Sequence, residues 1–556
     1  MGEKTMSLLL FEEDWRDVWD GAEPSTPVGA IFTKPDITEF IMDLAGYSPV
    51  RGRLSAKRLL EPSCGDGVFL AVAIKRLLDS EKNEAGCIDW EGANLVDSIK
   101  ACDLNSAFVR QARGLVVQQL KAAGCPEPRA AFFANTWIEH ADFLLKNWRD
   151  KFDYVIGNPP YVRLEDVPPG VMGRYRELYP LCVERADLYV AFFEQGLHLL
   201  KPDGALAFIC ANRFTKNLYG HSLREHIARR FRVRYYLNLE HTQPFVSDVS
   251  AYPCVTVIDR RHGEPTRAAT LDNLDGENLA SLLKQKDEPK SEAWSLFPQW
   301  YKDGAPWIAT DRRDYLRHEE LAKRHPLLED SADGVRVGIG VATGSDEIMI
   351  LPALDPNIEP ECQLPLILAG DVTAQTLNWS GHYLVNPYES GGDGGLRELR
   401  DYPGLRAYLE KNRARLARRH TAKKNPETWF RTIDRVMPSF AQQPKLLLPD
   451  IQAGGVVGLD EGKFYPQHNL YWITSEQWDL RALQGLLRSS CVLNQVRAIS
   501  VQMRGGSVRY QAQVLRKLRI PHAAKVTDLL MMRLASVAAS ANQQEIDSIV
   551  AEAFAL

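Results

Sequence analysis

The stretch Tyr154-Val155-Ile156-Gly157-Asn158-Pro159-Pro160-Tyr161 decides the fold class of this chain. Its apolar half predicts a buried strand, and the Asn-Pro-Pro-Tyr turn predicts where that strand ends. Proline fixes φ and lacks an N–H group, so the turn cannot continue a β-ladder. The Pro159 carbonyl stays free to accept a hydrogen bond, beside the Asn158 amide and the Tyr161 ring. Together these groups suit an amino group that is attached to a planar ring.

Strand-like and helix-like segments alternate around this stretch, as far as about Arg261. Between the strands lie amphipathic segments, such as the one in which Phe69, Val72, Ala73 and Leu77 recur at helical spacing. This alternation predicts an α/β sheet. The expected strands are Arg58–Leu60, Ile99–Cys102, Tyr154–Ile156, Ala205–Cys210, Arg234–Leu239 and Cys254–Ile258.

The second half has a different texture, with short β-branched runs separated by glycines. It predicts a mostly β, α+β domain that carries one long helix, at roughly Leu405–Arg419. We therefore expect four parts, at residues 1–262, a linker at 263–325, a second domain at 326–522 and a helical segment at 523–556. The expected strands of the second domain are Val335–Val341, His382–Val385, Lys445–Leu448 and Asn469–Ile473.

Composition narrows the class of protein. At 556 residues the chain is long enough for two large domains, and its 45% hydrophobic and 25% charged residues are typical of a globular protein. Its nine cysteines contain no C-x-x-C pair, which predicts reduced thiols and neither a disulfide framework nor a structural zinc site. No apolar run is long enough to cross a membrane, so we expect a cytoplasmic protein. We also expect no metal site. The net charge of -5 means that any nucleic-acid partner needs a local basic patch.

A glycine loop and an acidic residue predict a cofactor site. The loop Glu61-Pro62-Ser63-Cys64-Gly65-Asp66-Gly67 follows a short apolar strand and precedes a helix, and its glycines let the backbone approach a ligand. Asp103 ends the next strand, where an acidic side chain accepts from a ribose diol. A nicotinamide site would need G-x-G-x-x-G, but only Gly65 and Gly67 are present. The combination favours S-adenosylmethionine over a dinucleotide.

With these motifs placed, the N-terminal half resembles the gamma-class (Taq-type) adenine-N6 DNA methyltransferases of type II restriction–modification systems. The most specific matches are Ala141-Asp142-Phe143-Leu144-Leu145 and the stretch 152–161, and Asp187-Leu188-Tyr189 and Gly29–Pro35 are further matches. The resemblance implies a class I S-adenosylmethionine-dependent methyltransferase, with a Rossmann-like, mixed seven-stranded sheet. It also implies that the second domain recognises the DNA target.

The same resemblance assigns roles to individual residues around the cofactor. Asn135 remains an alternative to Asp142, because either residue could stand at the end of the third strand. The cofactor-binding residues that the resemblance implies are Thr33 and Glu61, Pro62, Ser63 and Cys64 at the methionine part, Gly65 and Gly67 in the loop, Asp103 at the ribose, Asp142 at the adenine amine, and Pro160 packed on the cofactor.

The expected chemistry is methyl transfer to a poorly nucleophilic amine. The Asn158 side-chain oxygen and the Pro159 carbonyl can bind the two amine hydrogens and aim the nitrogen lone pair at the methyl group. No cysteine nucleophile is needed. A paired base cannot reach such a site, so it must be flipped out of the duplex. Tyr161 would stack on one face of the base. Phe245 resembles the second aromatic residue of the family, which implies that it stacks on the other face.

Basic side chains in the second half supply the patch that the overall charge lacks. Phosphate contacts from them would give salt-sensitive binding to double-stranded DNA. The resemblance implies a monomer on DNA that works with a separate restriction endonuclease. The expected DNA-binding residues are Arg413, Arg415, Arg418, Arg419, Lys423 and Lys424 around the long helix, and Arg504 and Arg509 in a glycine-containing loop.

Other functions stay open. Pro449-Asp450 and Glu461-Gly462-Lys463 match the spaced carboxylate–lysine signature of restriction nucleases, although we interpret Asp460–Lys463 as a hairpin turn before Phe464. A bifunctional restriction–methylation enzyme is therefore one alternative. A methyltransferase of RNA or of a protein glutamine is a second, and a non-enzymatic DNA-binding subunit is a third.

Overall fold

The computed structural model contains two compact units, Met1–Arg312 and Arg313–Leu556. Each unit has its own core and is considered by itself. The structure describes residues 15–19, 30–91, 93–183, 185–247, 249, 252–261, 265–297, 300–301, 303–307, 312–373, 376–389, 391, 395–500 and 506–555.

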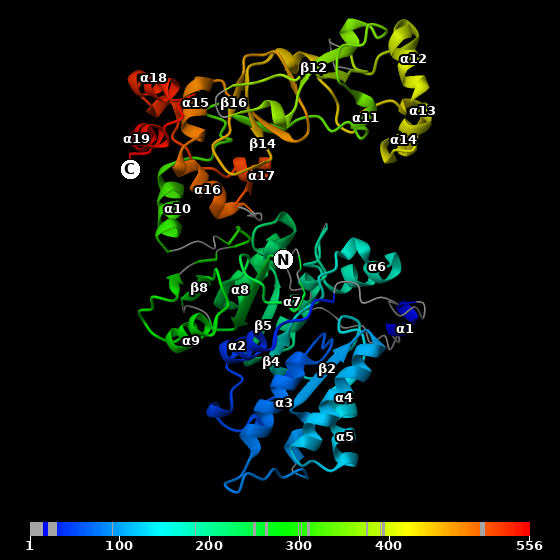
Figure 1. The fold of residues 1–556 in the computed structure, drawn as a ribbon, viewed down its shortest axis with the longest axis vertical. Helices are drawn as coiled ribbons and strands as arrows, with labels where there is room; N and C mark the ends of the chain where they lie inside the picture. Colours follow the sequence, from blue (N-terminus) through cyan, green and yellow to red (C-terminus); the bar gives the residue numbers. More distant parts are fainter. Residues whose placement is uncertain are drawn as a thin grey trace, which may run out of the picture. The chain divides into compact units, whose positions relative to one another are not determined.

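A nine-stranded sheet forms the centre of the first unit (Figure 1). Its order is β3-β2-β1-β4-β5-β7-β6-β8-β9, with β3 to β5 parallel and β7 antiparallel to both of its neighbours. The strands are β1 (Leu59–Glu61), β2 (Ile99–Asp103), β3 (Ile138–His140), β4 (Phe152–Gly157), β5 (Leu200–Ala211), β6 (Arg232–Asn238), β7 (Pro253–Asp259), β8 (Thr266–Thr270) and β9 (Ser295–Phe297).

The six strands expected from the sequence are all present, and the first seven strands in spatial order form the mixed sheet that the resemblance implies. Two further strands, β8 and β9, extend this sheet to nine. Both lie in the stretch 263–325, for which we expected a linker. Polar residues there suggested a loose connection, but β8 pairs with β6 and continues the sheet beyond its seventh strand. The compact units divide at Arg312 instead.

Residues of the central strands alternate between the two faces of the sheet, as the pleat requires. Ala207 and Ile209 of β5 join the core that also contains residues of α2 (Pro35–Ala45) and α3 (Val68–Glu81). Leu206 and Phe208 of β5 face α7 (Tyr189–His198), where Gly196 allows close contact. Both faces are thus buried, which explains why β4, β5 and β7 are apolar almost throughout.

Helices cover both faces, and α3, α4 and α5 lie side by side along one of them (Figure 1). The glycine loop joins β1 to α3. Because β1 to β5 are parallel, their carboxyl ends lie at one edge of the sheet, and the loop lies at that edge. The remaining helices of this unit are α1 (Trp15–Val18), α4 (Ser106–Ala122), α5 (Glu127–Trp137), α6 (Pro169–Leu178), α8 (His221–Arg230) and α9 (Gly276–Gln285).

The second unit is built on small sheets, as expected for a mostly β domain. The four strands predicted for it are present as β10, β13, β14 and β18. The sheets have the orders β10-β18-β14-β16, β11-β13-β12-β17 and β15-β19. Their strands are β10 (Arg336–Ile339), β11 (Ile350–Leu351), β12 (Gln363–Ile367), β13 (Tyr383–Val385), β14 (Lys445–Pro449), β15 (Ile451–Gln452), β16 (Gly458–Asp460), β17 (Tyr465–Pro466), β18 (Leu470–Thr474) and β19 (Val508–Arg509).

The single long helix expected near Leu405–Arg419 is three short helices instead. The Asn412 side chain donates to the Tyr408 carbonyl at 2.9 Å, and its backbone leaves the helical region with ψ of 4°. Extended backbone at Arg419 makes the second break. The helices of this unit are α10 (Arg312–Arg324, which begins at the unit boundary), α11 (Asp346–Met349), α12 (Pro403–Lys411), α13 (Arg413–Leu416), α14 (His420–Lys424), α15 (Leu480–Leu487), α16 (Ser490–Ile499), α17 (Ala512–Leu515), α18 (Asp528–Ser536) and α19 (Gln543–Ala553). Among the residues that the structure describes, no helix is long and apolar enough to span a bilayer.

Candidate active site

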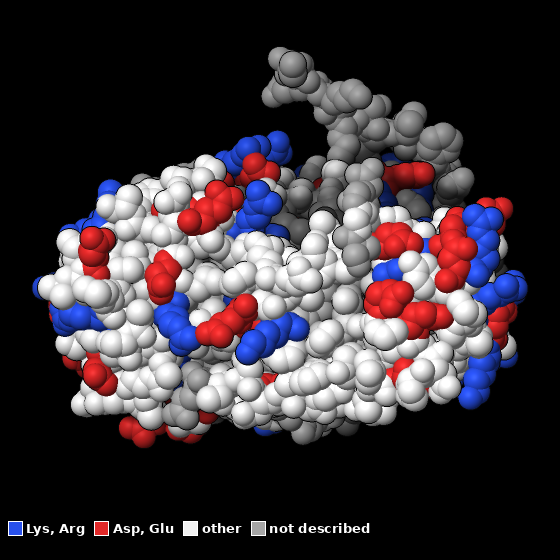
Figure 2. All heavy atoms as spheres, turned by 90° about the horizontal axis from the view of Figure 1, so that it is seen from above, with Lys and Arg blue, Asp and Glu red and all other residues white. Residues whose placement is uncertain are grey.

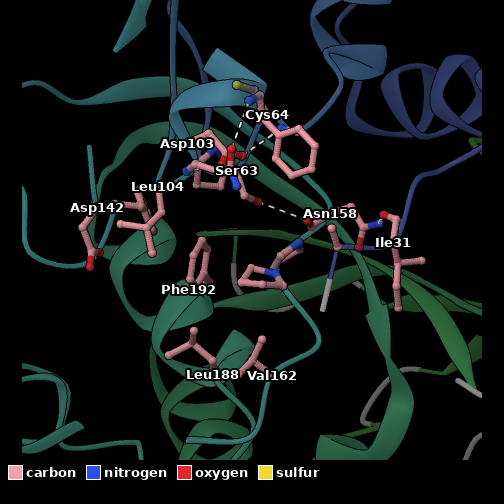
Figure 3. A pocket seen from close by; sticks show the side chains of 18 of the residues that line it. Ile31, Ser63, Cys64, Asp103, Leu104, Asp142, Asn158, Val162, Leu188 and Phe192 are labelled. Carbon is pink, nitrogen blue, oxygen red and sulfur yellow. Dashed lines mark hydrogen bonds between the residues drawn. The ribbon is translucent and has the colours of Figure 1, made fainter. Parts of the chain in front are cut away.

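A cavity of about 420 Å³ opens at the carboxyl ends of β1, β2 and β4. This volume lies within the range of cofactor sites in proteins. Figure 3 shows Asp142 and Asn158 on opposite sides of it, with Leu188, Phe192 and Val162 along one wall. Of the predicted site residues, the cavity brings together Thr33, Glu61, Pro62, Ser63, Cys64, Gly65, Asp103, Asp142, Asn158, Pro159 and Pro160, whereas Gly67, Tyr161 and Phe245 do not line it.

The Asn158 amide is held in one orientation. Its Nδ2 donates to the Ile31 carbonyl at 2.7 Å and to Thr33 Oγ1 at 3.2 Å. These two bonds use both amide hydrogens, so Oδ1 must point the other way, and this buried oxygen has no hydrogen-bond partner among the described residues. Ser63 Oγ donates to the Asn158 carbonyl at 3.1 Å, which ties the turn to the glycine loop. The site therefore presents an unused acceptor beside Pro159.

Pairing between two distant segments places Thr33 at this site. Lys34 N donates to the Pro244 carbonyl, and Val246 N donates to the Phe32 carbonyl, both at 2.9 Å. The Thr33 side chain is buried and lies directly opposite Phe245 in this short antiparallel bridge. The bridge thus carries both residues to the edge of the sheet where β4 ends.

The glycine loop is shaped by Asp103. One carboxylate oxygen of Asp103 accepts from Gly65 N at 2.9 Å, and the other accepts from Asn105 N at 2.9 Å. Gly65 has φ of +50° and Gly67 has φ of +89°, a region that other residues rarely adopt. Burial raises the pKa of Asp103, and these backbone hydrogen bonds partly offset the rise. The carboxylate keeps capacity for a ligand hydroxyl, as expected for a ribose-binding acid.

Glu61 is buried at the end of β1 and lines the cavity. Its Oε2 atom has no hydrogen-bond partner in the part of the chain that the structure describes. Burial raises the pKa of Glu61 well above its usual value, and the nearby carboxylates of Asp66 and Asp103 raise it further. A cluster of three acids with one unsatisfied oxygen favours a ligand that carries positive charge.

Asp142 stands two residues beyond β3 and is already fully hydrogen-bonded. Its Oδ1 accepts from Leu144 N at 2.8 Å and Leu145 N at 3.3 Å. Its Oδ2 accepts from the Tyr175 hydroxyl at 2.5 Å and from Trp19 Nε1 at 2.9 Å. The alternative residue Asn135 is exposed within α5 and does not line the cavity.

Tyr161 and Phe245 pack edge to face, with ring centroids 5.9 Å apart and an interplanar angle of 83°. The Tyr161 hydroxyl is buried and no described residue hydrogen-bonds to it, and Phe245 is 1% exposed. Two rings that sandwich a base would lie parallel, with the base between them. The arrangement seen here leaves no such slot, so the two rings do not form the expected sandwich in this conformation.

Comparison with known proteins shows the family to which the chain belongs. Residues 98–245 match the family model described as Eco57I restriction-modification methylase. The chain is 38% identical to the type II methyltransferase M.BstVI of Geobacillus stearothermophilus, over 95% of this chain and 96% of the relative. It is 41% identical to the type II methyltransferase M.PaeR7I of Pseudomonas aeruginosa, over 95% and 92% of the two chains. The chain belongs to the type II DNA methyltransferases.

A solved structure confirms the fold of this methyltransferase across both units. The type IIL restriction-modification enzyme MmeI, in complex with DNA, superposes with a TM-score of 0.59 and 14% sequence identity. The match covers 98% of this chain and 75% of the other. The methyltransferase therefore has the class I S-adenosylmethionine-dependent fold, with an additional mostly β unit.

The cavity fits S-adenosylmethionine, the cofactor of this family. The unpartnered Glu61 oxygen suits the positive charge of the methionine part, and Asp103 suits the ribose hydroxyls. A Cβ added at Gly65 would lie 3.4 Å from the Phe32 ring, which shows how closely the loop approaches its neighbour. Sequence reasoning missed several lining residues, namely Trp19, Ile31, Phe108, Val162, Tyr175, Leu188 and Phe192. Of these, Ile31 and Leu188 lay in motifs that the sequence had singled out.

Some of the basic residues expected to bind DNA form ion pairs within the protein, whereas others are exposed. Arg415 pairs with Glu347, and Arg413 pairs with Glu410 at 3.3 Å, whereas Arg418, Lys423 and Lys424 are exposed. On the molecular face in Figure 2, basic and acidic side chains are interspersed.

Two of the predicted arginines are tied to protein groups. Arg419 donates to the carbonyls of Thr343, Trp429 and Arg431 at 2.8 to 2.9 Å. Arg509 forms a two-point ion pair with Asp450, and its Nε lies 3.2 Å from Oδ1. Arg504 lies outside the described residues.

The acidic residues of the nuclease-like signature form ion pairs with arginines of the protein. Besides the Arg509 pair at Asp450, Glu461 pairs with Arg481 at 2.7 Å. Asp460–Lys463 is a turn, as expected, with Gly462 at φ of +89°, but it is not a hairpin, because β16 and β17 belong to different sheets. Within the described part of the chain, no three His, Cys, Asp or Glu side chains are arranged so that they could hold a metal ion.

Proposed function

We propose that this methyltransferase transfers the methyl group of S-adenosylmethionine to the exocyclic N6 amine of adenine in a specific duplex sequence. The observation that carries the proposal is the fixed Asn158 amide, whose Oδ1 is buried and unpartnered beside the Pro159 carbonyl. Pro159 is buried as well, and its carbonyl accepts no hydrogen bond from the described residues. An NH₂ group on a planar ring has two hydrogens to place on these two acceptors.

Binding both hydrogens does more than hold the amine. Adenine N6 is a poor nucleophile because its lone pair is delocalised into the ring. Two acceptors on the hydrogens favour a pyramidal nitrogen and leave the lone pair directed away from them. Because the Asn158 amide is held by Ile31 and Thr33, little reorganisation is required when the amine arrives.

In this proposal, Glu61 lies at the methionine part of the cofactor, Asp103 binds the ribose and Asp142 accepts from the adenine amine. S-adenosylmethionine supplies a methyl group already activated by its positively charged sulfur. Orientation is then the main requirement on the protein, and no cysteine nucleophile or strong general base is needed before transfer.

The target base is expected to leave the duplex and stack on Tyr161. Since Phe245 meets the Tyr161 ring edge to face, the second ring must shift for a base to be enclosed between them. The exposed basic side chains around α13 and α14 would contact phosphates. We expect a monomer on DNA, inside the cell, that protects its target sequence from a separate restriction endonuclease.

The experiment is nucleoside analysis of DNA after reaction with the purified methyltransferase. We expect N6-methyladenine as the methylated product. Asn158→Ala should abolish transfer and leave the Kd for S-adenosylmethionine within a few-fold of wild type. Asn135→Ala, which removes an exposed asparagine of α5, is the matched control and should be fully active. Methylated cytosine, or an active Asn158→Ala, would refute the proposal.

A further inference from the structure

A second hollow, of about 430 Å³, lies wholly within the second unit. Its lining residues are Asp346 and Glu347 of α11, the apolar residues Ile350, Pro352 and Leu368, Ala369 and Gly370, and the polar residues His382, Gln467 and Asn469. Acidic and amide side chains give its rim several hydrogen-bond acceptors, and Glu347 and Asn469 on it are exposed. The hollow thus combines apolar walls with several hydrogen-bond acceptors, and it shares no lining residue with the cofactor cavity.

A hydrogen-bond network that starts at the buried Asp371 holds His382 on the wall of this hollow. Asp371 is 5% exposed, and its Oδ2 accepts from Leu368 N at 2.9 Å and from Ser380 Oγ at 3.1 Å. Because Ser380 gives its single hydrogen to Asp371, its oxygen must accept from His382 Nδ1, which lies 2.7 Å away. The proton of the neutral imidazole therefore sits on Nδ1, and Nε2 carries a lone pair.

The other polar groups around the hollow are less free. Asp346 is held by Thr343 Oγ1 at 2.5 Å and by Gln467 Nε2 at 3.1 Å. Glu347 pairs with Arg415 of α13, so the hollow adjoins the exposed basic segment 413–424. No described residue hydrogen-bonds to His382 Nε2. His382 is thus the acceptor whose direction is set by the protein and whose lone pair is unused.

Acceptors of this kind discriminate between base pairs. In the major groove, the hydrogen-bond donors are the N4 amine of cytosine and the N6 amine of adenine, while guanine and thymine present acceptors. A neighbouring positive surface supplies the phosphate contacts that position a duplex but carry no sequence information.

We propose that His382 is a specificity-determining residue, which reads the amino group of a cytosine or adenine in the target sequence through Nε2. Ser380 and Asp371 act as positioning residues that hold the tautomer. This inference rests on the proposed function, since it needs the second unit to contact the DNA that is methylated.

The test uses the full chain and the target sequence found by sequencing modified DNA. Values of kcat/KM are measured on duplexes in which each base pair is replaced in turn. His382→Ala should lose roughly tenfold discrimination at one position that carries an amino group, and none elsewhere. Ser380→Ala keeps the ring but frees the tautomer, so it should lose part of this discrimination. His420→Ala, an exposed histidine of α14, is the control and should keep all of it.

A base analogue separates recognition from folding. Replacing the recognised base with its counterpart that lacks the amino group should slow wild type by roughly tenfold and leave His382→Ala unaffected. Unchanged discrimination in His382→Ala at every position, or an equal loss at all positions, would overturn the inference. A wild-type protein that methylates no DNA would instead overturn the proposed function.

Discussion

The Trp19 indole donates a hydrogen bond to Asp142 at 2.9 Å, at the carboxylate expected to receive the cofactor adenine. Because Asp142 already accepts from Tyr175 and two backbone N–H groups, it has no remaining lone pair for the adenine amine. One donor must leave when the cofactor binds. Tyr175 is 2% exposed, whereas Trp19 is only partly buried, so Trp19 is the donor that can move.

Trp19→Phe should therefore tighten cofactor binding. The substitution keeps an aromatic ring but removes the N–H group that competes for Asp142, so the Kd for S-adenosylmethionine should fall by roughly three- to tenfold. Isothermal titration calorimetry measures this directly. Trp15→Phe is the control, because Trp15 packs against His140 and does not line the cavity. An unchanged or higher Kd in Trp19→Phe would show that the indole does not compete.

Cofactor affinity should rise with pH because of Glu61. Its raised pKa means that part of the ligand-free protein carries a neutral Glu61, while a cationic ligand prefers the ionised form. The Kd of wild type should therefore fall as the pH rises through the Glu61 pKa. Glu61→Gln should bind more weakly and lose this dependence, although any titration of the cofactor itself is retained. Parallel pH profiles for the two proteins would contradict the assignment.

Arg419 and Arg418 should differ although they are adjacent. Arg419→Ala leaves three backbone carbonyls without their donor, so the free energy of unfolding should drop by about 2 kcal/mol or more. Arg418→Ala should leave stability unchanged and weaken DNA binding, with the slope of log affinity against log salt reduced by about 1. Chemical denaturation and DNA titrations at several salt concentrations measure the two effects. Equal behaviour in both assays would refute this division of roles.

Glu194 should make stability depend on pH near neutrality. Burial raises the pKa of this α7 carboxyl from 4.5 to about 7, although a hydrogen bond from Leu181 N opposes the rise. The folded state then binds a proton that the unfolded chain releases, so this stabilisation is complete below pH 4.5 and lost as the pH rises through about 7. Glu194→Gln should flatten the change in unfolding free energy over this interval. A wild-type curve with no such decline would contradict the prediction.

The features that could be predicted from the sequence are those that depend on residues close together in the chain. The strand before Asn158, the glycine loop at Gly65 and Gly67, and Asp103 at the end of β2 were all placed correctly, because each depends on neighbours in sequence. The extension of the sheet by β8 was missed, since a short polar strand is stabilised by its partner rather than by its own composition. The division of the expected long helix at Asn412 depended on one side chain that bonds back to Tyr408.

By itself, the sequence determined the fold class, the cofactor and the turn for which we propose binding of the amine, since apolar periodicity, proline and glycine act within a few residues of each other. Only the tertiary structure decided how these groups are aimed. The Asn158 oxygen is free because Ile31 and Thr33, more than a hundred residues away, take both amide hydrogens. The last free acceptor position of Asp142 is filled by Trp19, which lies 123 residues earlier in the sequence. Hydrogen bonds are directional, so the state of each acceptor depends on contacts that sequence spacing does not specify.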